Sequence, residues 1–240
     1  MAEWIYGKNL IKQRLNDGKK INTLYLLESQ VDKEIVSLAK EKRVLIQYVD
    51  RKRLDDYAKG EKHQGVVAEI DAYHYYSLDE ILTSIPEDKL PLLLMLDGLE
   101  DPQNLGAILR TCDAVGVDGV IIGKHRSVSL NATVAKVSTG AIETVKVTAV
   151  TNLNQTIHEL KEKGFWICGS DMEADDYRKV DYKVPLVLVV GSEGFGISQL
   201  VKKNCDFFVQ IPMYGEISSL NASVATAVLL YEIINQRFPV

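Results

Sequence analysis

The chain has 240 residues, 46% of them hydrophobic and 25% charged, which is enough for one large domain or two modest ones with buried cores. No apolar run reaches the roughly 18 residues of a membrane span, and the first ten residues lack the basic, then apolar pattern of a signal peptide. The three cysteines form no C-x-x-C pair, which argues against a zinc site or a disulfide framework and favours a reducing cytoplasm.

The formal net charge of −5 is distributed unevenly. Residues 1–63 contain 14 Lys and Arg against 10 Asp and Glu, a net charge of +4, and the remaining residues carry −9. This distribution allows an RNA-binding module at the N-terminal end. An ordinary solvated surface is the simpler explanation of the charge taken alone.

The first part of the chain alternates helix and strand. We predict helices at 7–18, 32–42 and 51–60, and strands at 22–28, 44–50 and 65–70. A polar, aromatic and proline-flanked stretch with one short helix follows, and it is typical of a linker. We therefore expect an N-terminal domain over residues 1–71, a linker over 72–88 and a second domain over 89–240.

The second part alternates in the same way, which predicts an α/β fold. Strands are expected at 91–98, 119–122, 144–150, 164–170, 185–193 and 207–212, and helices at 104–115, 131–138, 152–163 and 198–203. The first strand is apolar without alternation, as in parallel sheets covered on both faces. The last helix, from Ser219, is apolar nearly all round, so it is either central to its domain or shared between two chains.

Three loops after strands contain polar residues that folding does not require. In "DGLEDPQNLGAILR", Asn104 is a candidate cap for the following helix, and Arg110 lies near the start of that helix. In "VVGSEGFGIS", three glycines surround Glu193 and could expose backbone groups to a small polar ligand, although a tight turn explains them equally well. In "QIPMYGEISSLNASVA", Ser219 is the candidate cap of the last helix and Asn221 follows it.

Other kinds of catalytic site have little support. The chain has no H-E-x-x-H, no G-x-S-x-G and no dinucleotide fingerprint, and its four histidines are scattered along the sequence. Hydrolysis by a triad or a metal and nucleotide-dependent oxidoreduction are therefore disfavoured.

The three loops together resemble a known family. "NLGAILR", "VGSEGFGIS" and "IPMYGEISSLNASVA", in this order, are similar to the three motifs of the SpoU (TrmH-like) RNA ribose 2′-O-methyltransferases, and "KVSTGAIE" is similar to a further family segment. "IYGKN" and "HQGVVA" resemble the substrate-binding domain of the RlmB-type two-domain subgroup, which modifies a guanosine of large-subunit ribosomal RNA.

This resemblance implies a C-terminal parallel sheet of the SPOUT type with a deep trefoil knot, although knots run against the general rule for protein chains. It also implies a small N-terminal α/β domain similar to ribosomal protein L30e. Family members are homodimers with active sites at the subunit interface, which agrees with the apolar character of the last helix.

The resemblance further implies methyl transfer from S-adenosylmethionine to a ribose 2′-hydroxyl, without a metal. It implies cofactor binding largely by the backbone at Gly191, Ile211 and Leu220. The matching polar active-site positions are Asn104, Arg110, Glu193, Ser219 and Asn221.

The role of Arg110 has two interpretations. The family proposal makes it the general base, but a guanidinium with a pKa above about 12 is a poor base at neutral pH. A phosphate of the substrate could help it act on the hydroxyl, or Arg110 could bind that phosphate only. Asn104 and Ser219 are expected to orient Arg110 and the ribose, and Glu193 to order the glycine loop or hold Asn104.

Alternative functions stay open at this point. They are a transfer-RNA target, a ribosomal-RNA methylation that confers antibiotic resistance, and a catalytically silent RNA-binding protein on the same scaffold. Retention of all five polar positions argues against the silent protein, and the L30e-like N-terminal part favours ribosomal RNA by analogy.

Overall fold

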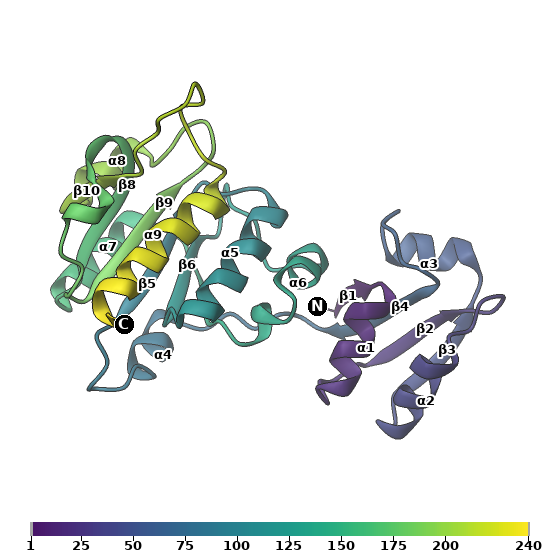
Figure 1. Cartoon of the computed structure of the whole chain (residues 1–240). Helices are drawn as coiled ribbons and strands as arrows, with labels where there is room; N and C mark the ends of the chain where they lie inside the picture. Colours follow the sequence, from purple (N-terminus) through teal and green to yellow (C-terminus); the bar gives the residue numbers. More distant parts are fainter. Residues whose placement is uncertain (1, 240) are drawn as a thin grey trace. The chain divides into compact units, whose positions relative to one another are not determined.

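The structure is a computed structural model that describes residues 2–239 (Figure 1). The chain divides into two compact units. Unit 1 contains the residues up to Tyr73 together with Leu130–Thr139, and unit 2 contains His74–Ser129 and the residues from Gly140 onward. No helix within residues 2–239 is long and apolar enough to cross a membrane.

Unit 1 is a four-stranded sheet with helices on both faces. The strand order is β1-β4-β2-β3, in which β2 and β3 are parallel and the other neighbours are antiparallel. The strands are β1 (Ala2–Tyr6), β2 (Thr23–Leu27), β3 (Leu45–Val49) and β4 (Val66–Asp71), and the helices are α1 (Lys8–Asn16), α2 (Lys33–Glu41), α3 (Arg51–Tyr57) and α6 (Ala132–Ser138).

Residues of α1 and α2 are buried against one face of this sheet, and residues of α3 against the other. The strand β1 was not among the predicted elements. It alternates nonetheless, since Ile5 packs with the first cluster and Tyr6 with the second.

The helix α6 belongs to unit 1 although its sequence lies within the expected second domain. Its Val134 and Ala135 are buried, and the hydroxyl of Thr133 lies 3.3 Å from that of Tyr6 on β1. The chain therefore leaves unit 2 after Ser129 and returns to it at Gly140.

Unit 2 is a six-stranded, entirely parallel sheet in the order β10-β8-β9-β5-β6-β7. Its strands are β5 (Leu92–Asp97), β6 (Gly119–Gly123), β7 (Val147–Val150), β8 (Trp166–Asp176), β9 (Leu186–Gly191) and β10 (Phe207–Gln210). Its helices are α4 (Leu78–Thr83), α5 (Pro102–Val115), α7 (Leu153–Glu162), α8 (Gln199–Asn204) and α9 (Ala222–Arg237), with 3₁₀ turns η1 (Ala141–Glu143) and η2 (Tyr177–Lys179). The α/β class with a parallel sheet is confirmed.

Helices cover both faces of this sheet. Apolar residues of α4, α7 and α8 form one core with the strands, including Ile81 from the expected linker, and α5 and α9 pack against each other over the opposite face (Figure 1). Both faces of β5 are therefore covered, which explains why Leu92 to Leu96 are all buried.

Two helices begin two or more residues away from their predicted starts. The helix α5 starts at Pro102 and is capped by Asp101, whose carboxylate accepts the backbone N–H of Gln103 at 2.9 Å. The expectation that Asn104 caps it is wrong, because proline is well tolerated at the first position and moves the start towards the N-terminus. The helix α9 starts at Ala222 with Asn221 as its cap, so the prediction of Ser219 was also wrong.

Candidate active site

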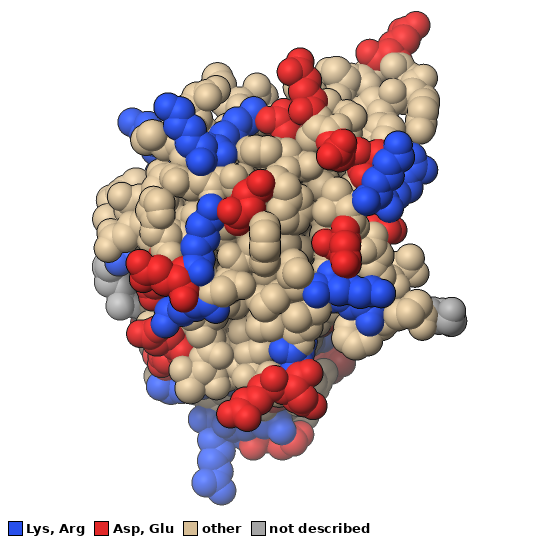
Figure 2. Space-filling view, turned by 90° about the vertical axis from the view of Figure 1, so that its left-hand side faces the viewer, with Lys and Arg blue, Asp and Glu red and all other residues tan. Residues whose placement is uncertain are grey.

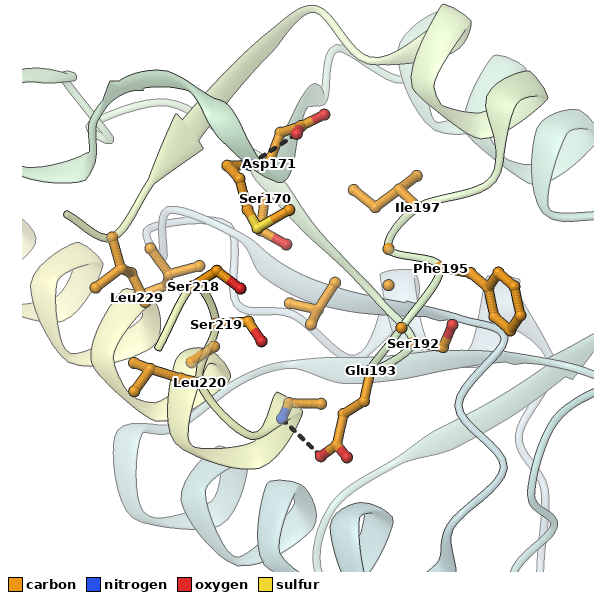
Figure 3. Close-up of a pocket in the computed structure, with 18 of the residues that line it drawn as sticks. Ser170, Asp171, Ser192, Glu193, Phe195, Ile197, Ser218, Ser219, Leu220 and Leu229 are labelled. Atoms are coloured by element: carbon orange, nitrogen blue, oxygen red, sulfur yellow. Dashed lines mark hydrogen bonds between the residues drawn. The ribbon is translucent and has the colours of Figure 1, made fainter. Parts of the chain in front are cut away.

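A cavity of about 440 Å³ lies at the carboxyl ends of β9 and β10, next to residues 170–172 in the middle of β8. Its wall consists of residues 170–172, 190–197 and 218–220, with Ile211, Met213 and side chains from α8 and α9 (Figure 3). The strand order reverses between β5 and β9, and open parallel sheets bind ligands at the carboxyl ends of their strands near such a reversal. The fold therefore places this cavity where a ligand site is expected.

The glycine loop after β9 forms one side of the cavity. Ser192 and Gly196 exchange two backbone hydrogen bonds, of 3.2 and 2.9 Å, which closes the loop tightly. A Cβ atom on Gly191 would lie 2.0 Å from the carbonyl carbon of Gly196, and Gly196 itself has φ = +63°. Residue 191 must therefore be glycine, because the backbone of Gly196 lies too close for a Cβ atom. Residue 196 favours glycine because its φ is positive.

The carboxylate of Glu193 connects this loop with two helices. Its Oε1 accepts hydrogen bonds from Asn104 Nδ2 at 3.0 Å, from the backbone N–H of Ala222 at 3.1 Å, and from Asn221 Nδ2. Asn221 Nδ2 also donates to Asn104 Oδ1 at 2.8 Å. Figure 3 shows the carboxylate directed towards the start of α9. Of the two roles expected of Glu193, ordering the glycine loop or holding Asn104, the structure contains the hydrogen bond to Asn104.

Asn104 and Asn221 each join this cluster from the first turn of a helix. Asn104 is only 6% exposed, in the third position of α5, and Asn221 uses its Oδ1 to cap α9 through the N–H groups of Ser223 and Val224. Neither Asn104 nor Asn221 lines the cavity, while Glu193 does. Three residues from distant parts of the sequence therefore fix the glycine loop against α5 and α9.

The remaining predicted positions fall into two groups. Gly191, Ile211, Ser219 and Leu220 all line the cavity. Arg110 does not: it is exposed in the middle of α5 and makes no hydrogen bond or ion pair with any described residue. Arg110 lies six positions after Asn104, which corresponds to about 120° around a helix, so the two side chains leave α5 in different directions.

The sequence analysis missed a charged pair in the cavity wall. Asp171, from β8, and Lys202, from α8, form an ion pair, and both line the cavity. Burial raises the pKa of Asp171, but the ammonium of Lys202 and backbone N–H groups outweigh burial and hold that pKa below its usual value. The signal in the sequence was the polar run "SDME" at residues 170–173, which follows residues 166–169 of the predicted strand directly.

The face of the molecule shown in Figure 2 has no single sign of charge. Basic and acidic side chains are interspersed on the face shown in Figure 2. Among residues 2–239, no group of His, Cys, Asp and Glu side chains could hold a metal ion.

Comparison with known proteins identifies the family to which the chain belongs. Residues 91–231 match the profile described as the SpoU rRNA Methylase family, and residues 4–76 match the one described as RNA 2'-O ribose methyltransferase substrate binding. The chain belongs to the SpoU methylase family. It is thus an RNA methyltransferase of the SpoU/TrmH type, with S-adenosylmethionine as its cofactor and RNA as its partner.

Relatives of similar length share this family. A Bacillus subtilis protein assigned by name to the TrmH family of tRNA/rRNA methyltransferases, YacO, is 47% identical over 243 residues, which cover 99% of this chain and 97% of that protein. A Staphylococcus haemolyticus protein with the same family assignment is 47% identical over 241 residues, covering 98% of this chain and 96% of that protein.

Solved structures agree with the fold. The SpoU methyltransferase AviRb from Streptomyces viridochromogenes, in complex with AdoMet, is 27% identical with a TM-score of 0.81, over 98% of this chain and 90% of that one. An AdoMet-bound rRNA methyltransferase from Sinorhizobium meliloti is 25% identical with a TM-score of 0.78, over 100% and 88%. A TrmH/SpoU tRNA modifying enzyme of A. aeolicus is 35% identical with a TM-score of 0.58, over 67% and 82%.

Proposed function

We propose that this protein methylates the 2′-hydroxyl of a guanosine ribose, with large-subunit ribosomal RNA as the target. The observation that carries the proposal is the cluster of Glu193, Asn104 and Asn221 at the edge of the cavity. The match of residues 4–76 to a ribose methyltransferase substrate-binding profile supports the ribose as the site of modification. The related solved structures that are described as rRNA methyltransferases support the choice of ribosomal RNA.

The residues of the cavity fit S-adenosylmethionine. The tight backbone approach at Gly191 leaves amide and carbonyl groups, rather than side chains, along one side, and Ile211 and Leu220 add apolar surface. A small number of polar groups in a mainly apolar, concave wall is typical of cofactor sites. When bound, the cofactor supplies a methyl group on a positively charged sulfur, which is already a good leaving group.

The protein then has two tasks, which are alignment of the hydroxyl and removal of its proton. The cluster around Glu193 holds the glycine loop rigidly, so the cavity keeps its shape without rearrangement. Ser219 lines the cavity and is exposed, so its hydroxyl is available to orient the ribose. Asn221 and Asn104 act as positioning residues, because their amides are engaged with Glu193 and with each other.

Arg110 is proposed to act on the RNA, either as the base that accepts the proton or as a ligand of a substrate phosphate. It is exposed and has no partner among the described residues, so its five N–H donors are available. A guanidinium binds phosphate through two parallel hydrogen bonds, whereas proton abstraction is opposed by its high pKa.

Arg110 does not line the cavity, which supports an active site completed by a second subunit. The helix α9 also keeps apolar side chains exposed at helical spacing, namely Val224 (48%), Tyr231 (57%) and Phe238 (64%) just beyond its end. An uncovered apolar face of this kind is typical of a subunit interface. A homodimer, the knotted crossing of the C-terminal chain, the L30e-like character of unit 1 and a cytoplasmic location are parts of this proposal.

The proposal is tested by mapping ribose methylation in total RNA from cells with and without the gene. We expect one guanosine of large-subunit ribosomal RNA to lose its methyl group. If a methylated site in transfer RNA is lost instead, the target is transfer RNA and not ribosomal RNA. If no methylated site is lost, the proposed activity is wrong.

The role of Arg110 is tested with purified protein and the target RNA. Arg110→Ala is expected to abolish methyl transfer while cofactor affinity and stability stay near those of the wild type. If Arg110 binds phosphate, Arg110→Lys loses RNA affinity together with turnover, because lysine lacks the planar fork. If it accepts the proton, RNA affinity holds while turnover falls and its pH profile moves. Full activity of Arg110→Ala would exclude both roles.

A further inference from the structure

This inference concerns the charges in the cavity wall and rests on the proposed placement of the cofactor there. Of the described residues that line the cavity, three are charged: Asp171, Glu193 and Lys202. Glu193 is directed at the start of α9, where its Oε1 accepts three hydrogen bonds. The ion pair of Asp171 and Lys202 is therefore the remaining charged feature of the cavity wall.

An irregularity in β8 brings Asp171 to the cavity. The strand β8 pairs with β10 up to Gly169 opposite Phe208, and pairing resumes at Asp175 opposite Val209. Residues 170–174 therefore leave the ladder of hydrogen bonds, and such bulges redirect side chains next to functional sites. Lys202 reaches the same place from α8, which covers the end of the sheet.

Both groups keep capacity for a ligand. Asp171 Oδ1 accepts the backbone N–H of Met172 at 2.7 Å, a second backbone N–H comes from Glu173, and Oδ2 contacts the ammonium of Lys202. Two carboxylate oxygens offer about four acceptor positions, and an ammonium has three N–H donors. These contacts leave one acceptor position on Asp171 and two donors on Lys202, and the side chains of Asp171 and Lys202 stay 23% and 32% exposed.

We propose that Asp171 and Lys202 bind the amino-acid end of the cofactor, Asp171 accepting from the α-ammonium and Lys202 donating to the α-carboxylate. This end of the molecule carries two opposite charges on one carbon atom, and the pair presents the complementary charges side by side. A lone carboxylate would suffice for the neutral hydroxyls of the ribose, whereas the additional ammonium of Lys202 suits the α-carboxylate of the cofactor. Because the pair is neutral as a whole, it adds no net repulsion towards the positive sulfur.

The test compares two ligands that differ only at this end of the cofactor. S-adenosylhomocysteine contains the amino acid, whereas 5′-methylthioadenosine keeps the adenine, the ribose and a thioether but lacks it. Binding of both is measured by calorimetry with the full-length wild-type protein and with the variants Asp171→Asn and Lys202→Met.

Lys161→Met is a matched control. Lys161 pairs with Asp206 at 2.7 Å, with exposures of 31% and 25%, close to those of the first pair, but neither residue lines the cavity. Thermal unfolding of each variant verifies that it is folded. If one of the two test variants does not fold, the other decides the question, because each removes one half of the pair.

We expect the affinity for S-adenosylhomocysteine to fall about tenfold or more in Asp171→Asn and in Lys202→Met, as for loss of a charged hydrogen bond. The affinity for 5′-methylthioadenosine stays within about twofold, and Lys161→Met changes neither. An equal fall for both ligands would overturn the inference in favour of a contact with the ribose. No change for either would place the pair outside the site, and a wild-type protein that binds neither ligand would instead remove the proposed cofactor site itself.

Discussion

Replacing Glu193 by alanine tests whether its carboxylate holds the glycine loop against the two helices. The change removes the acceptor of three hydrogen bonds. Asn104 is buried, and an unsatisfied buried donor costs about 1–3 kcal/mol. The N–H of Ala222 loses an anion at a helix N-terminus, worth about 0.3–1 kcal/mol, and the exposed Asn221 is rehydrated at little cost. Together these effects predict a loss of about 2–3 kcal/mol in the free energy of unfolding of unit 2.

The assay has to report on unit 2 alone, because a protein of two units does not unfold in a single step. The chain has two tryptophans, Trp4 in unit 1 and Trp166 in unit 2. In a Trp4→Phe background, the fluorescence of Trp166 follows unfolding of unit 2 in urea. Glu193→Gln keeps an acceptor oxygen but loses the charge, so it should cost about 1 kcal/mol.

Glu162→Ala is the control, because Glu162 is exposed on α7 and has no partner among the described residues. Its effect should stay within about 0.5 kcal/mol. If Glu193→Ala destabilises unit 2 no more than this control does, the carboxylate does not hold the loop, and the argument from the cluster fails.

Three further predictions concern other parts of unit 2. Arg237 donates hydrogen bonds of 2.6–3.2 Å to four backbone carbonyls in the segments before β5 and β9. Arg237→Ala should therefore lower the free energy of unfolding of unit 2 by about 3 kcal/mol in the same urea assay. A change near zero would contradict this prediction. Burial raises the pKa of Cys205 to about 12 and also raises the pKa values of Cys112 and Cys168. Iodoacetamide at pH 8 should therefore label these thiols only after unfolding, which mass spectrometry measures. Rapid labelling of the native protein would contradict this prediction. Tyr231→Glu should convert the proposed dimer to a folded monomer in light scattering, whereas an unchanged mass would exclude this face of α9 as the interface.

The sequence by itself determined the α/β class and most of the elements, because those depend on local patterns. The continuous apolar run of β5 predicts a strand covered on both faces, and its residues 92–96 are all buried. The bounds of α5 and α9 were less accurate, since several polar residues near each start could serve as the cap. Pro102 is the first residue of α5, which makes Asp101 its N-terminal cap. At α9 the side chain of Asn221, and not that of Ser219, accepts the N–H groups of the first turn.

Only the tertiary structure decided which polar residues meet. Asn104, Glu193 and Asn221 are separated by 89 and 28 positions in the chain, and the parallel order of β5 and β9 brings them within hydrogen-bond distance. Asp171 lines the cavity where five residues of β8 are not paired with β10, and the polar run at 170–173 by itself does not show what these residues contact. Arg110 matches the family motif as well as Asn104 does, yet it points elsewhere, because residues six apart lie about 120° apart on a helix. Local patterns fix the elements, whereas a site depends on contacts between residues that are distant in sequence.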